Sequence, residues 1–216
     1  MKNASSQAGV SVIELILVIV VLAILCTISV VSFMNSRKYS ADDQAKKIID
    51  VFDEARQKAL NQRKTFRVEI NKTRNELVLI DEGSDISPTA GDDVILKRFP
   101  ISGQVVIGAA PSNVSGAPVA TSPIPVATYA SSSYPLSSGE QKITLRFRRN
   151  GQVVDVGSDN IGTGSMVNGA TIYVYSTTPS VTSPDVIRAI TVLGTTGDSS
   201  LYKCKFSGAT CTNWSR

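Results

Sequence analysis

An acidic residue at the start of a long uncharged stretch is the part of this sequence whose chemistry is easiest to state. Glu14 comes directly before residues 15–36, which contain no charged side chain. If this stretch is helical, its rise of about 1.5 Å per residue lets it cross a hydrocarbon layer of about 30 Å. An ionised carboxylate at the start of such a helix is costly to bury alone, so we expect Glu14 to pair with a positive group.

The rest of the chain contains few residues of the kinds that carry out enzyme catalysis. The sequence contains no histidine, which removes the commonest general base, the Ser–His and Cys–His nucleophile pairs and every histidine-containing zinc site. We find no convincing nucleophile motif or metal-ligand cluster in their place. We therefore expect a protein that is not an enzyme and that has no catalytic residue, no bound metal and no cofactor. A membrane-anchored enzyme is the weaker alternative.

Two cysteines near the C-terminus are close enough in sequence to pair. Cys204 and Cys211 flank a short segment of mostly small and polar residues, whereas the third cysteine, Cys26, lies within the uncharged stretch. Four thiolate ligands for a structural zinc ion are not available. The spacing of the pair suits a disulfide across a small loop in an oxidising compartment, and we predict a Cys204–Cys211 disulfide.

Two charged groups each allow a plain and a functional interpretation. Arg146, Arg148 and Arg149 lie on or beside one predicted strand, where they form either a solvated sheet face or a contact for a polyanion such as DNA. The formal net charge of +4 permits such a partner without requiring it. An acidic loop offers oxygen atoms that suit Ca²⁺ but lacks the spacing of an EF-hand, so a solvent-exposed turn is the plain interpretation. Its acidic residues are Asp81, Glu82, Asp85, Asp92 and Asp93.

The element that must position Glu14 is a helix. No proline or glycine occurs in residues 10–64, so nothing in the sequence breaks a helix there. Beyond residue 36 the stretch becomes amphipathic, because apolar residues recur at steps of three and four, namely Ala45, Ile48, Phe52, Ala55 and Ala59. We predict one helix over residues 10–61, apolar and transmembrane at its start and packed on a sheet through this stripe.

The rest of the 216-residue chain has the composition of one β-rich domain. Asn150-Gly151 predicts a two-residue hairpin turn. The Pro/Ser-rich residues 108–140 predict a long loop over the domain. The expected fold class is α+β, with a long N-terminal helix, its first half transmembrane, packed on an antiparallel sheet. Runs that alternate between apolar and polar residues predict the strands, at residues 66–70, 76–80, 94–99, 104–107, 142–148, 152–156, 170–175, 186–193 and 201–206.

The N-terminal residues resemble the class III signal of type IV pilins and pseudopilins. Gly9 precedes a bulky residue, Glu14 follows five residues after the glycine, and an unbroken apolar stretch comes next. The resemblance implies that a prepilin peptidase cleaves between Gly9 and Val10 and that the new amine of Val10 is methylated. It also implies that Glu14 is the assembly glutamate, which pairs with such an amine. A generic signal anchor is the alternative.

The match departs from the family pattern at two places. The family usually has Phe or Met at the position of Val10, and Thr-Leu where this chain has Ser11-Val12. Many members also carry a proline where this chain has Val31. Because proline is the usual cause of a helix kink, we expect a straighter helix here.

Two later segments resemble minor pseudopilins of the H kind and minor pilins of the T and U kinds. They are residues 54–62 and residues 144–151, in which Phe147 and Gly151 match a loose Phe-x-x-x-Gly hairpin. The resemblance implies four regions. These are a leader peptide at 1–9, a transmembrane and assembly helix at 10–36, an amphipathic continuation of that helix at 37–64, and a globular domain at 65–216.

The function that this resemblance implies is that of a structural subunit of the type II secretion pseudopilus, which serves protein secretion across the outer membrane. Its partners would be other pseudopilins, the prepilin peptidase and the inner-membrane assembly platform. The chain would sit in the bacterial inner membrane as a single-pass protein with its C-terminal domain in the periplasm.

A minor type IV pilin in pilus biogenesis or DNA uptake is the alternative function. Minor pilins that take up DNA carry a Gly-Arg-x-Arg pattern in the C-terminal region. The nearest equivalent here is Gly197-Asp198-Ser199-Ser200, which has an acid and hydroxyl groups in place of arginines. We therefore favour a protein partner over a nucleic-acid partner.

Overall fold

The computed structural model describes residues 12–83, 93–119, 122–123, 127–128, 140–155, 169–176, 187–207 and 210–216. The chain divides into two compact units, Met1–Arg37 and Lys38–Arg216. Helix α1 (Val12–Gln62) is 51 residues long and contributes to both units. It ends at Gln62, because the next residue, Arg63, has a φ of 53° in the left-handed region.

The transmembrane part of the fold-class prediction needs correction. A helix that crosses a bilayer needs about 20 consecutive, mostly apolar residues. Within the ranges given above, no helix combines sufficient length with sufficient apolar character to cross a membrane. The prediction that the first half of the helix is transmembrane is therefore wrong for the described residues.

The first sheet is built from antiparallel neighbours. Its strand order is β3-β2-β1-β7-β6, and β8 pairs with the same strand, β7. A hairpin is present at Asn150-Gly151, since β7 and β8 pair antiparallel on either side of it. The turn is not the predicted two-residue one, because Arg148 pairs with Gln152 and leaves the three residues 149–151 between them. The strands are β1 (Phe66–Asn71), β2 (Glu76–Asp81), β3 (Val94–Pro100), β6 (Ala127–Thr128), β7 (Gln141–Phe147) and β8 (Val153–Asp155).

A second sheet replaces the single sheet that the sequence predicted. Its order is β12-β11-β10-β9-β4, and β5 pairs with β9 in parallel. The fold-class prediction of one antiparallel sheet is therefore wrong. The reason is that alternation of apolar and polar residues identifies a strand but not the sheet that it joins. The strands are β4 (Val105–Gly108), β5 (Ser122–Pro123), β9 (Ala170–Ser176), β10 (Arg188–Val192), β11 (Ser199–Ser207) and β12 (Thr210–Ser215).

The switch between sheets occurs after β3. The backbone N–H of Ile101 donates to the carbonyl of Asn75, which holds the chain at the edge of the first sheet before β4 enters the second. The region predicted as a long loop, residues 108–140, contributes the two-residue strands β5 and β6. β6 is the last strand in the order of the first sheet, and β5 pairs with β9 beside the strand order of the second sheet. Proline is tolerated at the edge of a sheet.

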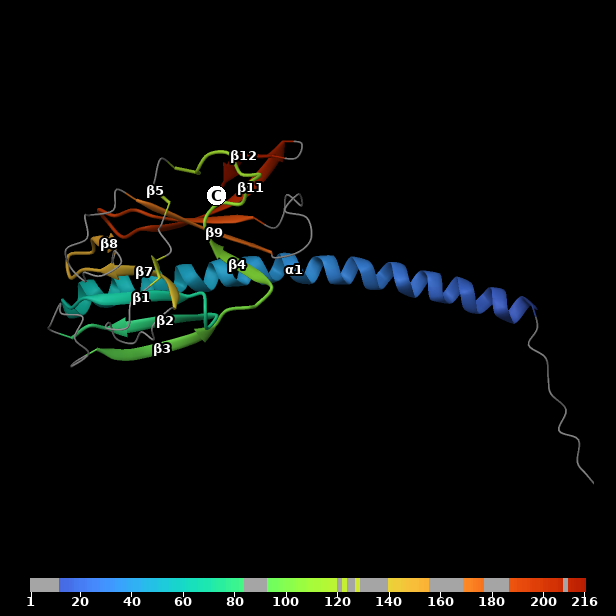
Figure 1. Cartoon of the computed structure of the whole chain (residues 1–216), viewed down its shortest axis with the longest axis horizontal. Helices are drawn as coiled ribbons and strands as arrows, with labels where there is room; N and C mark the ends of the chain where they lie inside the picture. The colour runs from blue at the N-terminus through green and yellow to red at the C-terminus, as the bar shows by residue number, and fades with distance from the viewer. Residues whose placement is uncertain are drawn as a thin grey trace, which may run out of the picture. The chain divides into compact units, whose positions relative to one another are not determined.

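One hydrophobic core joins α1 to both sheets. The C-terminal part of α1 runs along the strands in Figure 1, and its predicted apolar stripe is fully buried. Burying one large apolar side chain contributes about 1.5–3 kcal/mol, so this shared core is the main stabilising feature of the unit Lys38–Arg216. Its members include Ile48, Phe52 and Ala55 of α1, Val68, Leu79 and Leu145 of the first sheet, and Ile107, Ile172 and Ile190 of the second.

Two glycine turns meet at the C-terminal end of α1. The turn at Gly151 belongs to the first sheet and the turn at Gly197 to the second, and a Cβ atom on Gly197 would lie 2.6 Å from the carbonyl oxygen of Gly151. Arg56 of α1 donates to the carbonyl of Thr196 at 2.6 Å and pairs with Asp198 at 3.0 Å. These contacts fix the end of the helix against both sheets.

Candidate functional site

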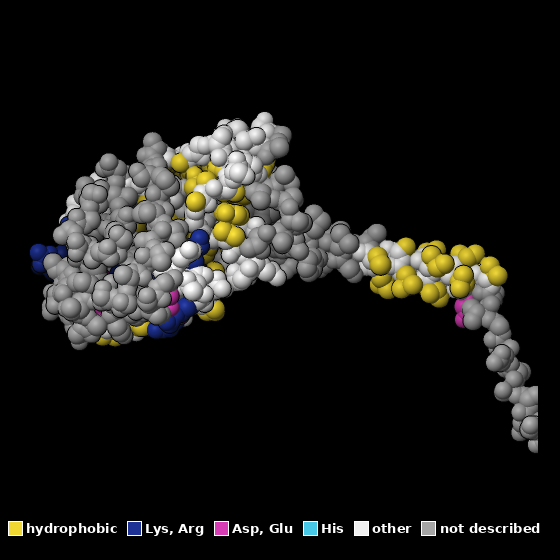
Figure 2. Space-filling view, viewed as in Figure 1, with side chains coloured by type: hydrophobic (Ala, Val, Ile, Leu, Met, Phe, Trp, Pro, Cys, Tyr) yellow, Lys and Arg dark blue, Asp and Glu magenta, His cyan; other side chains and the backbone are white. Residues whose placement is uncertain are grey.

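The first candidate region is the apolar N-terminal part of α1, residues 12–26 in the unit Met1–Arg37. The large apolar side chains of this segment are between 46% and 76% exposed, with Val21 the least and Ile13 the most exposed. Figure 2 shows hydrophobic side chains as a yellow band on this part of the helix. An apolar surface of this kind marks a site of contact with another apolar surface.

Glu14 lies at the very start of this segment. It is the acidic residue in the first turn of α1, where unpaired backbone N–H groups give the helix end a partial positive charge that favours a carboxylate. Its side chain is exposed, so it is available to a partner. The predicted cleavage and methylation sites, Gly9 and Val10, lie outside the described residues.

The cysteines occupy two separate places. Cys204 of β11 and Cys211 of β12 form a disulfide, with Cα atoms 5.9 Å apart. This bond joins β11 and β12, which are neighbouring strands of the second sheet. Cys26 is a free, exposed thiol on α1.

The second candidate region is the face of the first sheet that points away from α1. In β1 and β7 every second residue faces the core, and the residues between them are polar or charged. The unexpected finding is that these polar residues are buried, with exposures of 0–4%. They are Arg67, Glu69, Asn71, Lys142, Thr144 and Arg146.

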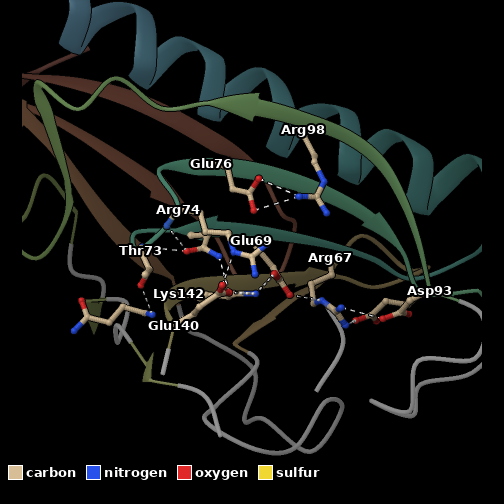
Figure 3. Close-up of polar contacts among 12 residues, drawn as sticks. Arg67, Glu69, Thr73, Arg74, Glu76, Asp93, Arg98, Glu140 and Lys142 are labelled. Carbon is tan, nitrogen blue, oxygen red and sulfur yellow. Dashed lines mark hydrogen bonds and ion pairs between the residues drawn. The ribbon is translucent and has the colours of Figure 1, made fainter. Parts of the chain in front are cut away.

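Arg67 is the centre of an ion-pair network on this face (Figure 3). Its guanidinium donates to Glu69 at 2.9 Å, to Glu82 at 2.6 Å and to Asp93 at 2.9 Å. Arg146 of β7 shares one of these partners, since its Nη2 donates to Oε1 of Glu82 at 2.8 Å. The Glu82 carboxylate therefore bridges two buried arginines from neighbouring strands.

The network continues along the sheet through Lys142. Its ammonium lies 3.0 Å from Glu69 and 3.4 Å from Glu140. Glu140 also accepts a hydrogen bond of 2.9 Å from Nδ2 of Asn71 and pairs with Arg74. Among the residues that the structure describes, these ion pairs connect four cations with four anions, namely Arg67, Arg74, Lys142 and Arg146 with Glu69, Glu82, Asp93 and Glu140.

The pKa values of the two central arginines are shifted in opposite directions. Burial alone would lower the pKa of Arg67, but Glu69, Glu82 and Asp93 outweigh it and raise the pKa. Burial lowers the pKa of Arg146, and the nearby charge of Arg67 adds to this effect, while Glu82 opposes it without cancelling it. Nη1 of Arg146 is also buried without a hydrogen-bond partner. Arg146 is therefore the least compensated cation of the network.

The prediction of a solvated basic face is wrong for Arg146. Its side chain is 0% exposed and faces Glu82 at 2.6 Å, so it cannot take part in an open polyanion surface. Arg148 and Arg149 follow β7 at the turn, and the backbone N–H of Arg148 donates to the carbonyl of Gln152. The structure therefore does not bring the three arginines together on one exposed face.

The acidic loop also has a different role from the one considered for Ca²⁺. Glu82 and Asp93 bind arginines, and Asp81 accepts from Lys64 at 3.3 Å. Asp85 and Asp92 lie outside the described residues. Among the residues that the structure does describe, no group of three or more His, Cys, Asp or Glu side chains could hold a metal ion.

A sequence signal for the buried network was present but ambiguous. Arg67 and Glu69 alternate with apolar residues in β1, and Lys142 and Arg146 do so in β7. Opposite charges on paired strands fit a solvated sheet face equally well. Only the observed register, which pairs Arg67 with Arg146 and Glu69 with Thr144, shows how the charges meet.

Comparisons with known proteins give no relative. The chain matches no protein-family model, no curated protein and no solved structure.

Proposed function

We propose that this chain is a minor pseudopilin, a non-enzymatic subunit of the type II secretion pseudopilus that assembles through the N-terminal part of α1. Its partners are other pseudopilins, the prepilin peptidase and the assembly platform of the bacterial inner membrane. The C-terminal domain lies in the periplasm. A role for this filament in protein secretion across the outer membrane follows from the same proposal.

The exposure of the apolar residues 12–26 is the observation that supports this proposal most strongly. Twelve large apolar side chains of this segment are exposed, and they include Val12, Leu17 and Leu25. A helix that is apolar on all sides is covered on all sides in its working state. A bundle of such helices from neighbouring subunits supplies that cover, and it leaves the carboxylate of Glu14 to pair with a neighbouring amine.

The C-terminal unit agrees with a structural role. Its buried charges form ion pairs within the sheet, and its cysteine pair forms a disulfide, as proteins of oxidising compartments do. We do not propose the DNA-uptake alternative, because Arg146 is buried against Glu82.

The test is the substitution Glu14→Ala in the full chain, expressed with the other filament subunits. Removing the carboxylate deprives the neighbouring amine of its partner, so incorporation into the filament should fall at least about tenfold, which corresponds to about 1.4 kcal/mol. Glu76→Ala is a matched control, because Glu76 lies on β2 and pairs with Arg98 of the same sheet at 3.2 Å. Undiminished incorporation of the Glu14→Ala protein would contradict the proposal.

A further inference from the structure

The face of the second sheet that points away from α1 carries five aromatic side chains, which we call the aromatic face. Alternate residues of β9, Ile172 and Val174, lie in the shared core, so Tyr173 and Tyr175 point to the other side. Half of the chain's six tyrosines and its only tryptophan belong to this face. Its members are Tyr173, Tyr175, Tyr202, Phe206 and Trp214.

The strand register explains how these side chains meet. Tyr173 of β9 lies opposite Ala189 of β10, and Ala189 lies opposite Tyr202 of β11. Because Ala189 is small, large rings can lean over it, and the ring centroids of Tyr173 and Trp214 are 6.0 Å apart with their planes at 52°. Apart from Tyr173, the aromatic side chains are only half-buried. The face therefore remains open to a partner.

The second sheet carries positive charges that lack partners. Its strands contain no acidic side chain. Arg188 of β10 pairs with Asp42 of α1. In the part of the chain that the structure describes, Lys203, Lys205 and Arg216 form no ion pair. The two lysines alternate with the aromatic residues of β11, and a sheet one residue thick is thinner than the screening length of about 10 Å. All three cations therefore favour an anionic partner at this face.

The aromatic face itself offers donors for a carboxylate. The Arg216 guanidinium lies over the ring of Tyr202 at 5.5 Å from its centroid, and its Nε and Nη2 donate to Tyr202 and Ser200. A guanidinium has five N–H donors, so Arg216 keeps further donors for a partner. Within the described residues, the hydroxyl groups of Tyr173 and Tyr175 form no hydrogen bond. Burial raises the pKa of both tyrosines, which keeps them protonated as donors.

These properties favour a protein partner over other occupants. Trp, Tyr and Arg are the residue types that contribute most to binding at protein–protein interfaces. A second copy of the same face would bring like charges together, which is unfavourable. Nucleic-acid bases stack on bare ring faces, but Arg216 covers one face of the Tyr202 ring and Trp214 leans against Tyr173.

We propose that the aromatic face binds an extended acidic segment of a partner protein. Tyr173 on β9 and Arg216 at the end of β12 are three strand spacings apart, which corresponds to about 14 Å. Two carboxylates at positions i and i+4 of an extended segment span roughly 13 Å. One carboxylate accepts from Tyr173 and Tyr175, the other accepts from Arg216, and an apolar residue between them packs on Trp214. This contact goes beyond the proposed filament function and does not rest on it.

Trp214 reports on the contact directly, because it is the only tryptophan of the chain. The probe is a synthetic peptide, Gly-Glu-Ser-Phe-Ser-Glu-Gly, blocked at both ends and titrated into the full chain in a mild detergent. We expect a saturable change in tryptophan fluorescence and a binding constant that weakens as salt is added. Matched peptides with lysine in place of both glutamates, or with serine in place of phenylalanine, should not bind. No saturable response to the acidic peptide would overturn the inference.

Substitutions at exposed positions separate the contact from folding. Arg216→Glu should weaken binding of the acidic peptide at least about tenfold and should create binding of the lysine peptide. Arg63→Glu is the matched control, since Arg63 is an exposed arginine after α1 that also forms no ion pair within the described residues. It should bind the acidic peptide as the parent chain does. Equal binding by the two arginine variants would contradict the contact.

Tyr175→Phe tests the role of the phenol groups. This change keeps the aromatic ring and removes one donor, so binding of the acidic peptide should weaken about fivefold. Unchanged binding would show that the carboxylate does not lie at this end of the face.

A last titration identifies the class of partner. A single-stranded oligonucleotide should give a weaker response than the acidic peptide, and an equal or tighter response would overturn the protein partner. These titrations contain no other filament subunit, so their failure leaves the filament function standing. Normal incorporation of the Glu14→Ala protein would remove the filament function and leave this contact untouched.

Discussion

The N-terminal part of α1 and the outward face of the first sheet differ in which kind of side chain they expose to water. Residues 12–26 are almost entirely apolar and are exposed. The charged residues of β1 and β7 are buried, with Arg146 at 0% and Arg67 at 2%. In most soluble domains apolar side chains are inside and charged side chains are outside.

This difference shows which region has its interaction partners within its own unit. The buried charges of the sheet find their partners within the same unit, since Glu82 bridges Arg67 and Arg146 and Lys142 binds Glu69. The large apolar side chains of residues 12–26 are exposed instead. We therefore expect changes in the sheet to act on stability and changes in the helix segment to act on assembly.

The largest expected effect is that of Glu82→Ala. This change leaves Arg67 and Arg146 buried without the carboxylate that they share, and loss of one partner from a buried ion pair costs about 3–5 kcal/mol. Urea unfolding of the full chain, followed by near-ultraviolet circular dichroism, measures the loss.

Glu76→Ala is the control for this prediction. Glu76 pairs with Arg98, whose side chain is 47% exposed, and exposed pairs contribute at most about 1 kcal/mol. Equal losses from both substitutions would show that burial of the network has no special importance.

An intermediate effect is expected at the ion pair between α1 and the second sheet. Asp42 accepts hydrogen bonds from the buried Arg188 of β10. Burial alone would raise the pKa of Asp42, but the hydrogen bond and charge of Arg188, with smaller effects of Lys203 and Lys46, outweigh it and lower the pKa. Asp42→Asn should cost about 1.5–3 kcal/mol at neutral pH.

The pH dependence of this pair has a defined sign. Because the pKa of Asp42 is lower in the folded chain, its contribution is present above about pH 4, the range of an unfolded aspartate. The contribution is lost as the pH falls through the lowered folded value. The unfolding free energies of the parent and Asp42→Asn proteins should therefore converge in acid; a constant difference down to pH 2 would refute this explanation.

The smallest effect on stability is expected from Leu17→Gln. Leu17 is 64% exposed, so the unfolding free energy of the C-terminal unit should change by less than about 0.5 kcal/mol. Incorporation into filaments should nevertheless fall, because a polar amide would replace an apolar contact between subunits. A loss of stability without a loss of assembly would reverse the comparison.

The sequence predicted the features that depend on local pattern. The apolar stripe of Ile48, Phe52 and Ala55 is buried, as its spacing of three and four residues indicated. The hairpin at Asn150-Gly151 is present, and its glycine supplies the left-handed backbone that the turn needs, with a φ of 82°. The turn has three residues rather than the predicted two, since Arg148 pairs with Gln152.

The features that depend on long-range pairing escaped prediction. Asp42 binds Arg188, which is 146 residues away in sequence, and no local spacing indicates this pair. The division into two sheets and the burial of Arg146 depend on strand register in the same way. Local spacing cannot distinguish a buried charge with a distant partner from a solvated one.

The most direct test of the proposed function is the mass of the mature N-terminus. The full chain should be isolated from envelopes that contain an active prepilin peptidase. If Glu14 is the assembly glutamate, the mature chain begins at Val10 and its amine is methylated. A chain that keeps Met1 under these conditions would contradict the account.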